Sequence, residues 1–496
     1  MTNYSRKKKG GRLLGQGKYG CGFQPALTCK REKTSRPGIS KMVTNKGVAD
    51  NEYRISQKIR QIDPDRMYFI TATGYCEHDG VSINRSLNKL GRRCAHNPTG
   101  QFTSQMYLIF YPMGGEDLEH IRVRPNKYGS FIRGFKNLIE GLKVLHDANI
   151  FHVDIKPDNI LSSFENNQYN TRFIDFGLTV TDTEKLTPKS DILYKLSNHV
   201  YEKYHLYYPI DVILMYEYGD VGDNFINNWY KHSIQNLIYP QSSYWDKYWN
   251  PKITSKNLLL KQYFDNKDFY TDTNRAVKSV DIAALGTSLS FVYSRITGHY
   301  SRIGDNGNDI IQIYIPGYPH IISINDLTID HFNGQQDILD WHLKIAKNIS
   351  MYMFMLIKNM INYNGKDRFT AFEALNFFNK YIKNIDSYFQ DELLTYKALT
   401  MIGIHVDETR ENIPSPTSTL SNTNITRYTN LLKPFRKHKN IKIFTGHNNT
   451  ITKPTTKFSN YIKTYNTRGH NNTVNKPIKK FGNYIKAYNT TQRYRK

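Results

Sequence analysis

The stretch that decides the fold is HVDIKPDN at residues 152–159, with a DFG tripeptide shortly after it at Asp175–Gly177. An aspartate closely followed by a lysine and an asparagine suits the transfer of a phosphoryl group from a metal-bound nucleotide to a hydroxyl. Asp154 can orient the hydroxyl and accept its proton, and Lys156 can neutralise charge on the transferred group. Asn159 and the DFG aspartate offer the oxygen ligands that Mg²⁺ prefers.

Short apolar runs flank both motifs and indicate strands. The flanking residues are Ile150, Phe151, Ile160, Leu161, Phe173 and Ile174. Short apolar runs with polar residues at their ends are typical of buried strands. We therefore predict a β-hairpin between the motifs that brings Asp154 and Asp175 to one metal. The alternative, chance polar residues on a surface turn, does not account for these flanks.

The two motifs resemble a pair found in eukaryotic-type protein kinases. HVDIKPDN is similar to their H-R-D-L-K-x-x-N catalytic loop, and FIDFGL at residues 173–178 is similar to their D-F-G strand and turn. Lys156 is typical of the serine/threonine kinases. The resemblance implies an α+β, bilobal protein-kinase-like fold with Asp154, Lys156 and Asn159 as catalytic residues. It also implies the cofactors ATP and Mg²⁺, with Asn159 and Asp175 as the metal ligands.

The resemblance covers residues 12–385 and sets the domain boundaries that we expect. The expected segments are a basic N-terminal arm (1–11), a small β-rich N-lobe (12–111), a larger helical C-lobe (112–385) with an insertion (215–275), a linker (386–411) and a disordered basic tail (412–496). Aromatic residues of the insertion either pack it onto the large lobe or dock a substrate. From residue 290 to 400 the pattern is typical of helices and carries no motif.

Composition favours a folded, soluble and intracellular protein. Hydrophobic residues make up 39% of 496 residues, enough to fill substantial cores. No run approaches the roughly 18 apolar residues that a membrane span needs, and no apolar stretch follows the basic start. Four cysteines are too few for a disulfide framework, so we expect reduced thiols. A net charge of +25 suggests an anionic partner.

Three glycines near the N-terminus stand at G-x-G-x-x-G spacing. Gly15, Gly17 and Gly20 lie between apolar flanks, which predicts a β-turn-β flap whose backbone can approach phosphates. A dinucleotide-binding fold uses the same letters, but there a helix follows the glycines. Here Gly22 and Phe23 continue as a strand. In kinases this flap covers the nucleotide.

The nucleotide-binding lysine of the kinase third strand has two candidates here. Lys30 sits in a charged cluster, whereas Ile39–Val43 alternates like a strand and carries Lys41, so we choose Lys41. A helix expected over residues 49–59 supplies Glu52 as its partner. In the family such a pair holds the lysine on the α- and β-phosphates. The alternative for Glu52 is an ordinary solvated helix charge.

Residues 106–118 resemble the kinase fifth strand, the interlobe hinge and the start of the next helix. Phe110 lies where a backbone carbonyl meets the adenine amino group. Pro112 falls where a backbone N–H normally meets adenine, and proline has none. Either Met113 donates after a one-residue shift, or adenine is held by fewer bonds. Glu116 is placed to reach the ribose.

The C-lobe departs from the family pattern in two places. Val153 replaces the arginine that grips a phosphate on the activation segment, so we predict activity independent of phosphorylation there. Asp281–Gly286 resembles the D-x-W-x-x-G start of a helix but comes unusually late, and the preceding A-P-E motif is absent. Tyr208–Asp211 is its closest substitute, with Asp211 as a partner for Arg368. A helical stripe precedes the catalytic loop at Phe131, Phe135, Leu138, Leu142 and Leu145.

Two C-x-H pairs raise the question of a zinc site. Cys76, His78, Cys94 and His96 supply the ligand types of a tetrahedral zinc site. Their one-residue spacers are shorter than the usual two to four. Buried or free thiols are therefore the favoured reading.

The tail has a composition of its own. Residues 412–496 contain seventeen Lys and Arg and neither Asp nor Glu. Residues 446–468 recur as 469–491 with 16 identical positions. Two copies are too few for a solenoid. Lysines interleaved with aromatic rings suit nucleic acid or another polyanion. A disordered basic tether is the simpler alternative.

These observations favour an active serine/threonine protein kinase that uses ATP and Mg²⁺ on protein substrates, without a membrane partner. The Asn-, Lys-, Ile- and Tyr-rich composition resembles the divergent kinases of large nucleocytoplasmic DNA viruses (mimivirus-like), which would place it in host cytoplasm or a virion. An alternative is a pseudokinase scaffold whose tail binds nucleic acid or a viral protein. The retained Lys41, Asp154 and Asp175 argue against it. A small-molecule phosphotransferase is a third alternative, which Phe176 and Lys156 disfavour.

Overall fold

The computed structural model describes residues 12–16, 20–30, 32, 36–78, 106–181, 267–303, 309–318, 321–362 and 364–406. All of them lie in one compact unit, Met1–Leu420; the second unit, Ser421–Lys496, falls outside the described residues, as does the rest of the predicted tail. No helix in the described part of the chain is long and apolar enough to cross a membrane.

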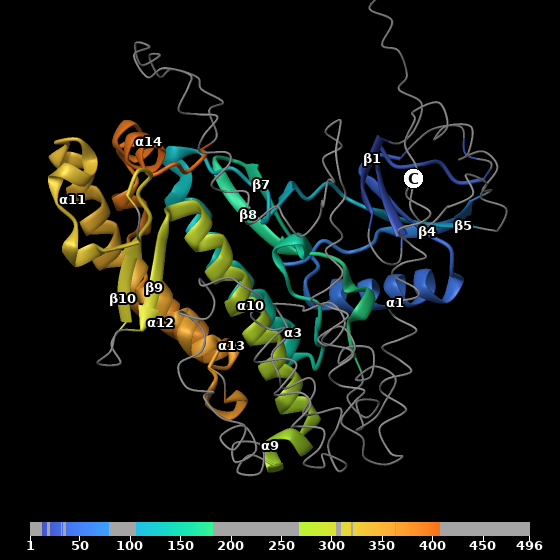
Figure 1. The fold of residues 1–496 in the computed structure, drawn as a ribbon. Coiled ribbons are helices and arrows are strands. Elements are labelled where there is room, and N and C mark those ends of the chain that lie inside the picture. The colour runs from blue at the N-terminus through green and yellow to red at the C-terminus, as the bar shows by residue number, and fades with distance from the viewer. Residues whose placement is uncertain are drawn as a thin grey trace, which may run out of the picture. The chain divides into compact units, whose positions relative to one another are not determined.

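The N-lobe is a five-stranded antiparallel sheet with one helix against it (Figure 1). The strand order is β1-β2-β3-β5-β4. The elements are β1 (Arg12–Gln16), β2 (Gly20–Gln24), β3 (Ile39–Val43), α1 (Lys46–Ile62), β4 (Gly74–His78) and β5 (Met106–Tyr111). Successive side chains of a strand point to opposite faces, and apolar residues occupy both faces of this sheet. Met42 and Leu108 pack with Phe23 on one face, whereas Val43 and Ile109 pack with Ala49 of α1 on the other.

The cysteines of this lobe form disulfides, so the prediction of reduced thiols is wrong. Cys29, in the segment after β2, is joined to Cys76 on β4, and Cys21 is disulfide-bonded as well. The Cys29–Cys76 disulfide links the segment between β2 and β3 to β4, an edge strand of the sheet. It also removes Cys76 as a zinc ligand, and no three His, Cys, Asp or Glu side chains of the described residues gather to hold a metal. Cys94 and His96 lie outside the described residues.

The C-lobe is mainly helical, with two small sheets. Its first part contains β6 (Glu116–Asp117), α3 (Tyr128–Asp147), β7 (Ile160–Glu165) and β8 (Gln168–Phe173), and the 3₁₀ turns Pro125–Lys127, Pro157–Asn159 and Phe176–Leu178. The strands form the sheet β6-β7-β8. The helix predicted at the end of residues 106–118 is absent, because Glu116 and Asp117 pair with β7.

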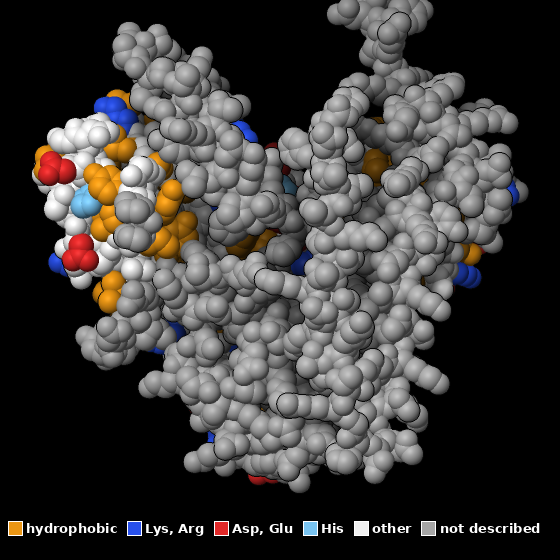
Figure 2. Space-filling model, in the orientation of Figure 1, with side chains coloured by type: hydrophobic (Ala, Val, Ile, Leu, Met, Phe, Trp, Pro, Cys, Tyr) orange, Lys and Arg blue, Asp and Glu red, His pale blue; other side chains and the backbone are white. Residues whose placement is uncertain are grey.

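The second part of the C-lobe begins at residue 267, earlier than the sequence suggests, and contains strands as well as helices. It contains α9 (Lys267–Thr271), α10 (Thr273–Thr297), β9 (His299–Ile303), β10 (Asp309–Ile313), β11 (Ile322–Ser323), α11 (Gln336–Ile345), a π-helical turn (Ala346–Ser350), α12 (Met351–Met360), α13 (Ala371–Tyr381) and α14 (Glu392–Met401). The 3₁₀ turns here are Ile324–Asp326, Ile329–Phe332, Gly365–Asp367 and Ile385–Tyr388. Figure 2 shows hydrophobic side chains gathered on the face around α11 and the β9–β10 hairpin.

Four boundaries therefore need correction. Strands β9, β10 and β11 form a three-stranded sheet within the stretch expected to be helical. The described part of the expected linker 386–411, residues 386–406, is folded into the lobe, since α14 lies in it and the Ala398 carbonyl accepts a hydrogen bond from His342. Asp281 lies inside α10 instead of starting it. The end of the expected insertion already forms α9 and the first turn of α10.

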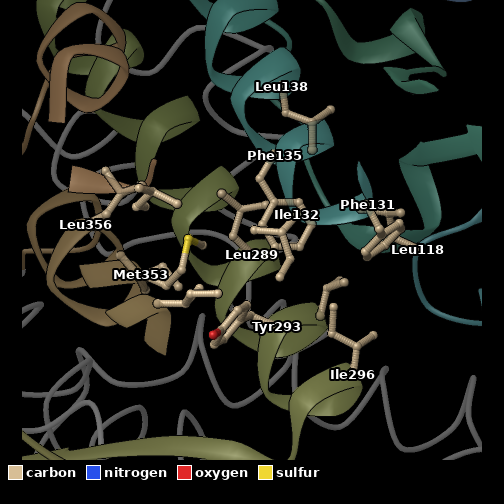
Figure 3. Close-up of a cluster of buried hydrophobic side chains, with 14 of the residues drawn as sticks. Leu118, Phe131, Ile132, Phe135, Leu138, Leu289, Tyr293, Ile296, Met353 and Leu356 are labelled. Atoms are coloured by element: carbon tan, nitrogen blue, oxygen red, sulfur yellow. The ribbon is translucent and has the colours of Figure 1, made fainter. Parts of the chain in front are cut away.

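The core of the C-lobe lies where α3, α10 and α12 meet. The predicted stripe on α3 is buried throughout and belongs to one cluster with Leu289 of α10. Figure 3 shows Phe135 close to Leu289 and Phe131 beside Leu118. Residues at this helical spacing share one face, which explains why a single stripe packs so completely. Gly286 lets α12 approach, because a Cβ there would lie 2.8 Å from the Cβ of Met360. The core thus supports α10 beneath the catalytic loop.

Candidate active site

Lys41 lies at the centre of three charged side chains. Its Nζ donates to Oε1 and Oε2 of Glu52 at 2.9 and 3.0 Å, and to Oδ1 of Asp175 at 2.7 Å. β3 supplies the lysine and α1 the glutamate, while Asp175 follows β8. Glu52 faces inward because it shares the buried face of α1 with Ile55 and Ile59. Lys30, the other candidate, is exposed.

The electrostatics of this cluster keep Lys41 protonated. Burial alone lowers the pKa of Lys41, but the carboxylates of Asp175 and Glu52 outweigh burial and raise it above its ordinary value. Burial opposes ionisation of Asp175 too, yet Lys41 holds the pKa of that carboxyl below its usual range. Burial raises the pKa of Glu52, against the lowering effect of Lys41. The lysine is therefore a fixed cation held between two acids.

The catalytic loop gathers its three predicted residues around one carboxylate. Lys156 Nζ lies 3.1 and 2.9 Å from the two carboxylate oxygens of Asp154. Asn159 Nδ2 donates to Oδ2 of Asp154 and to its backbone oxygen, both at 2.8 Å. A short 3₁₀ turn, Pro157–Asn159, folds the asparagine back toward the aspartate, and proline suits its first position. Charge-assisted hydrogen bonds thus orient the carboxylate of Asp154.

Two hydrogen bonds connect the catalytic loop to the DFG segment. His152 Nε2 donates to the carbonyl of Ile174 at 3.0 Å, and the Ile174 N–H donates to the carbonyl of Asn159 at 3.0 Å. Strands β7 and β8 pair with Ile160 opposite Phe173, so the predicted hairpin is present. Asp175 has a left-handed backbone (φ 60°) that directs its carboxylate to Lys41. The hairpin therefore brings Asn159 and Asp175 into one neighbourhood.

A buried aspartate of α10 is hydrogen-bonded to the backbone of the catalytic loop. Asp281 is fully buried and accepts the backbone N–H groups of His152 and Val153, at 2.8 Å each, on its two carboxylate oxygens. Val153 has φ 51°, an unusual conformation for a β-branched residue. The two bonds fix the backbone immediately before Asp154. The sequence marked Asp281 only as a helix residue, because its contact to the loop depends on tertiary structure.

The residues predicted for the flap and the hinge lie in the N-lobe strands, Gly15 in β1, Gly20 in β2 and Phe110 in β5. Gly15 lies in β1, which pairs with β2 as predicted, and Gly17 falls outside the described residues. Gly20 serves strand packing, since a Cβ there would lie 2.2 Å from the backbone oxygen of Met42. At the hinge, the Phe110 carbonyl already accepts from the N–H and hydroxyl of Thr73, at 2.7 and 3.2 Å. An adenine amino group would have to compete for that oxygen.

The other two residues expected to contact the nucleotide lie near the surface. Met113 is half exposed, and its sulfur accepts a bond from Gln24 Nε2 at 3.3 Å, which links the end of β2 to the hinge. Glu116 is exposed on β6, opposite Ser162 of β7. Their expected roles toward adenine and ribose stay predictions.

Arg368 is buried where the resemblance places the family's structural arginine. Its side chain donates to the backbone oxygens of Asn362 and Ser279, at 2.5 and 3.3 Å, and to the Ser279 hydroxyl at 3.0 Å. These contacts attach the segment before α13 to α10. Asp211, the partner that the sequence suggested, lies outside the described residues.

The donor set fits a hard divalent cation. Asn159 presents an amide and Asp175 a carboxylate, and oxygen is what Mg²⁺ binds. Because Asn159 donates both of its described bonds to Asp154 through Nδ2, its Oδ1 is left as an acceptor. Gly177 leaves space beside Asp175, since a Cβ there would lie 3.3 Å from Oδ1.

Comparison with known proteins agrees with this geometry. A family model matches residues 9–193, which include the flap, Lys41, Glu52 and both loops. The matching family is the protein kinase domain. The described residues have the kinase fold, a β-sheet N-lobe followed by a helical C-lobe.

The curated relatives are kinases of low identity. CBL-interacting protein kinase 17 of Oryza sativa subsp. japonica is 27% identical over 168 residues, covering 27% of this chain and 36% of that protein. Mitogen-activated protein kinase 5 of Arabidopsis thaliana is 25% identical, covering 36% and 41%. Serine/threonine-protein kinase chk-1 of Caenorhabditis briggsae is 33% identical, covering 19% and 20%. The chain thus spans less than half the length of each of these relatives, and the resemblance to viral kinases remains a prediction.

Among solved structures, the autoinhibited serine kinase domain of the giant muscle protein titin is similar over 78% of this chain and 86% of that chain. The identity is 14% and the TM-score 0.36.

Proposed function

We propose that this chain is a protein-serine/threonine kinase that transfers the γ-phosphate of ATP to protein hydroxyls with Mg²⁺. The observation that carries the proposal is the joint arrangement of Lys41 between Glu52 and Asp175, and of Asp154 between Lys156 and Asn159. A fixed cation beside an acid and an oriented carboxylate are the groups that phosphoryl transfer requires. The family match over residues 9–193 supports the same reading.

Each residue has a distinct role in this proposal. Lys41 would bind the α- and β-phosphates, with Glu52 holding it in place. Asp154 would orient the substrate hydroxyl and accept its proton, while Lys156 would neutralise charge that develops on the transferred group. Asp175 and Asn159 would hold Mg²⁺, which when bound neutralises phosphate charge. The serine/threonine preference rests on Lys156 and on the kinase relatives.

We also propose that phosphorylation of the activation segment is not required for activity. Val153 is buried and apolar where an arginine would receive that phosphate, and the N–H of Val153 is held by Asp281. Phosphatase treatment of the purified protein should leave the rate unchanged within about twofold. A large drop in rate after dephosphorylation would contradict this part of the proposal.

The test of the proposal is transfer of ³²P from labelled ATP to a generic basic protein. Wild type is compared with Asp154→Asn, which keeps the shape of the side chain and removes its charge. Asp147→Asn is the matched control, since Asp147 is an exposed aspartate at the end of α3 that pairs with Lys143. Loss of about a hundredfold or more in Asp154→Asn alone supports a catalytic aspartate. Equal, negligible incorporation in all three proteins would refute the kinase and favour a scaffold.

A further inference from the structure

The end of β5 brings a tyrosine hydroxyl to the Lys41 cluster. Tyr111 donates a hydrogen bond to Oε1 of Glu52. In the β3–β5 pairing, Ile109 lies opposite Lys41 and Tyr111 lies opposite Ile39. Alternate residues of a strand share a face, and so do residues paired across two strands, so Tyr111 projects from the same face as Lys41. This is the face against which α1 and its glutamate pack.

The tyrosine completes the contacts of a deeply buried carboxylate. Glu52 is 1% exposed, and its Oε1 accepts from both Lys41 and Tyr111, whereas Oε2 accepts from Lys41. A buried carboxylate is stable as an anion only when its oxygens are hydrogen-bonded. Lys41 is shared with Asp175, whose contact is the shortest of the three. Glu52 therefore needs a donor that Asp175 does not compete for.

We propose that Tyr111 is a positioning residue of the nucleotide site, whose hydroxyl fixes the Glu52 carboxylate in the orientation in which both its oxygens hold Lys41. The proposal rests on the phosphotransfer function proposed above, since it assigns Lys41 to the nucleotide. In this role Tyr111 acts through Glu52, to which its hydroxyl donates. Without the hydroxyl, the carboxylate is free to rotate and Lys41 moves toward Asp175.

A double-mutant cycle tests this role. Tyr111→Phe removes only the hydroxyl, and it is made in the wild-type and in the Glu52→Gln background. We expect Tyr111→Phe to lower kcat by about tenfold, the effect of a hydrogen bond to a charged group. In the Glu52→Gln background the same substitution should change kcat by less than about twofold, because the two residues act as one unit.

Tyr107→Phe is the matched control. Tyr107 lies on the same strand and the same face, and it packs with Val43, Ala49 and Ile109. Its substitution removes a hydroxyl without touching Glu52, so kcat should stay within about twofold of wild type. Equal losses in Tyr107→Phe and Tyr111→Phe would overturn the proposal, as would a Tyr111→Phe effect that is unchanged in the Glu52→Gln background.

A binding measurement separates this proposal from the kinase activity itself. The dissociation constant of a fluorescent ATP analogue with Mg²⁺ is determined for all five proteins, independently of turnover. If wild type transfers no phosphate but binds the nucleotide, the proposed function has failed. The proposed role of Tyr111 is then supported if Tyr111→Phe weakens nucleotide binding several-fold and this loss disappears in the Glu52→Gln background. It is refuted if the losses of the two single variants add in the double variant. Absence of nucleotide binding by wild type refutes both proposals.

Discussion

Replacing Asp281 by asparagine tests whether α10 holds the catalytic loop in place. Both oxygens of the carboxylate accept backbone N–H groups at 2.8 Å, and the side chain is fully buried. Asparagine keeps one oxygen but turns an NH₂ group toward the second donor, leaving that donor unsatisfied. A hydrogen bond to a charged group is worth about 1.5–3 kcal/mol, and a buried unpaired donor costs about 1–3 kcal/mol. We therefore expect a loss of about 2–4 kcal/mol in the free energy of unfolding.

The assay combines thermal unfolding with phosphotransfer. The unfolding entropy is about 2.1 cal/mol/K per residue, so for a folded unit of this size such a loss lowers the Tm by roughly 2–5 °C. Asp154 follows the two anchored residues, so kcat should also fall, by about tenfold or more at temperatures where the variant is folded. Asp272→Asn is the control, because Asp272 caps the first turn of the same helix and asparagine caps equally well. A Tm change in Asp281→Asn no larger than in this control would refute the reasoning.

Three further predictions concern parts of the chain outside the catalytic loop. Burial lowers the pKa of His342 to about 3 and lowers that of its partner His299 well below the ordinary value, so the unfolded chain alone binds these protons. The contribution of the two histidines to the free energy of unfolding should be complete above pH 6.5. It should fall toward pH 3 by up to about 1.4 kcal/mol per pH unit for each histidine. An unchanged free energy of unfolding between pH 7 and pH 5 would contradict this. Reduction, or Cys29→Ser, should lower stability by about 2–4 kcal/mol through loss of the bond to Cys76, and an unchanged Tm with reductant would count against that bond. Deleting residues 412–496 should abolish retention on heparin at moderate salt while sparing phosphotransfer; unchanged retention would remove the tail as the polyanion-binding segment.

The sequence predicts best those features that depend on local pattern. Alternation in Ile39–Val43 selected Lys41 over Lys30, and helical spacing placed Glu52 on a buried face; the structure brings these two side chains into contact. The hairpin between the catalytic loop and the DFG segment followed from apolar flanks in the same way. In each case a few neighbouring residues determine which way a side chain points.

The features that the sequence did not reveal depend on partners far along the chain. Tyr111 and Asp281 reach the site through strand register and helix packing, which alternation within one segment cannot specify. Strand parity was the available signal for Tyr111, because it shares a face with Ile109. The Cys29–Cys76 bond needed the position of β4 relative to the β2–β3 connection. The sheet β9–β11 was missed because apolar residues in its short strands also fit a helical pattern.

A crystal structure of the protein with Mg²⁺ and a non-hydrolysable ATP analogue tests the central claim most directly. The claim predicts a metal ion about 2.1 Å from an oxygen of Asp175 and from the amide oxygen of Asn159, with Lys41 Nζ on the α- and β-phosphates. A nucleotide-bound metal without either ligand, or Lys41 turned away from the phosphates, would contradict it.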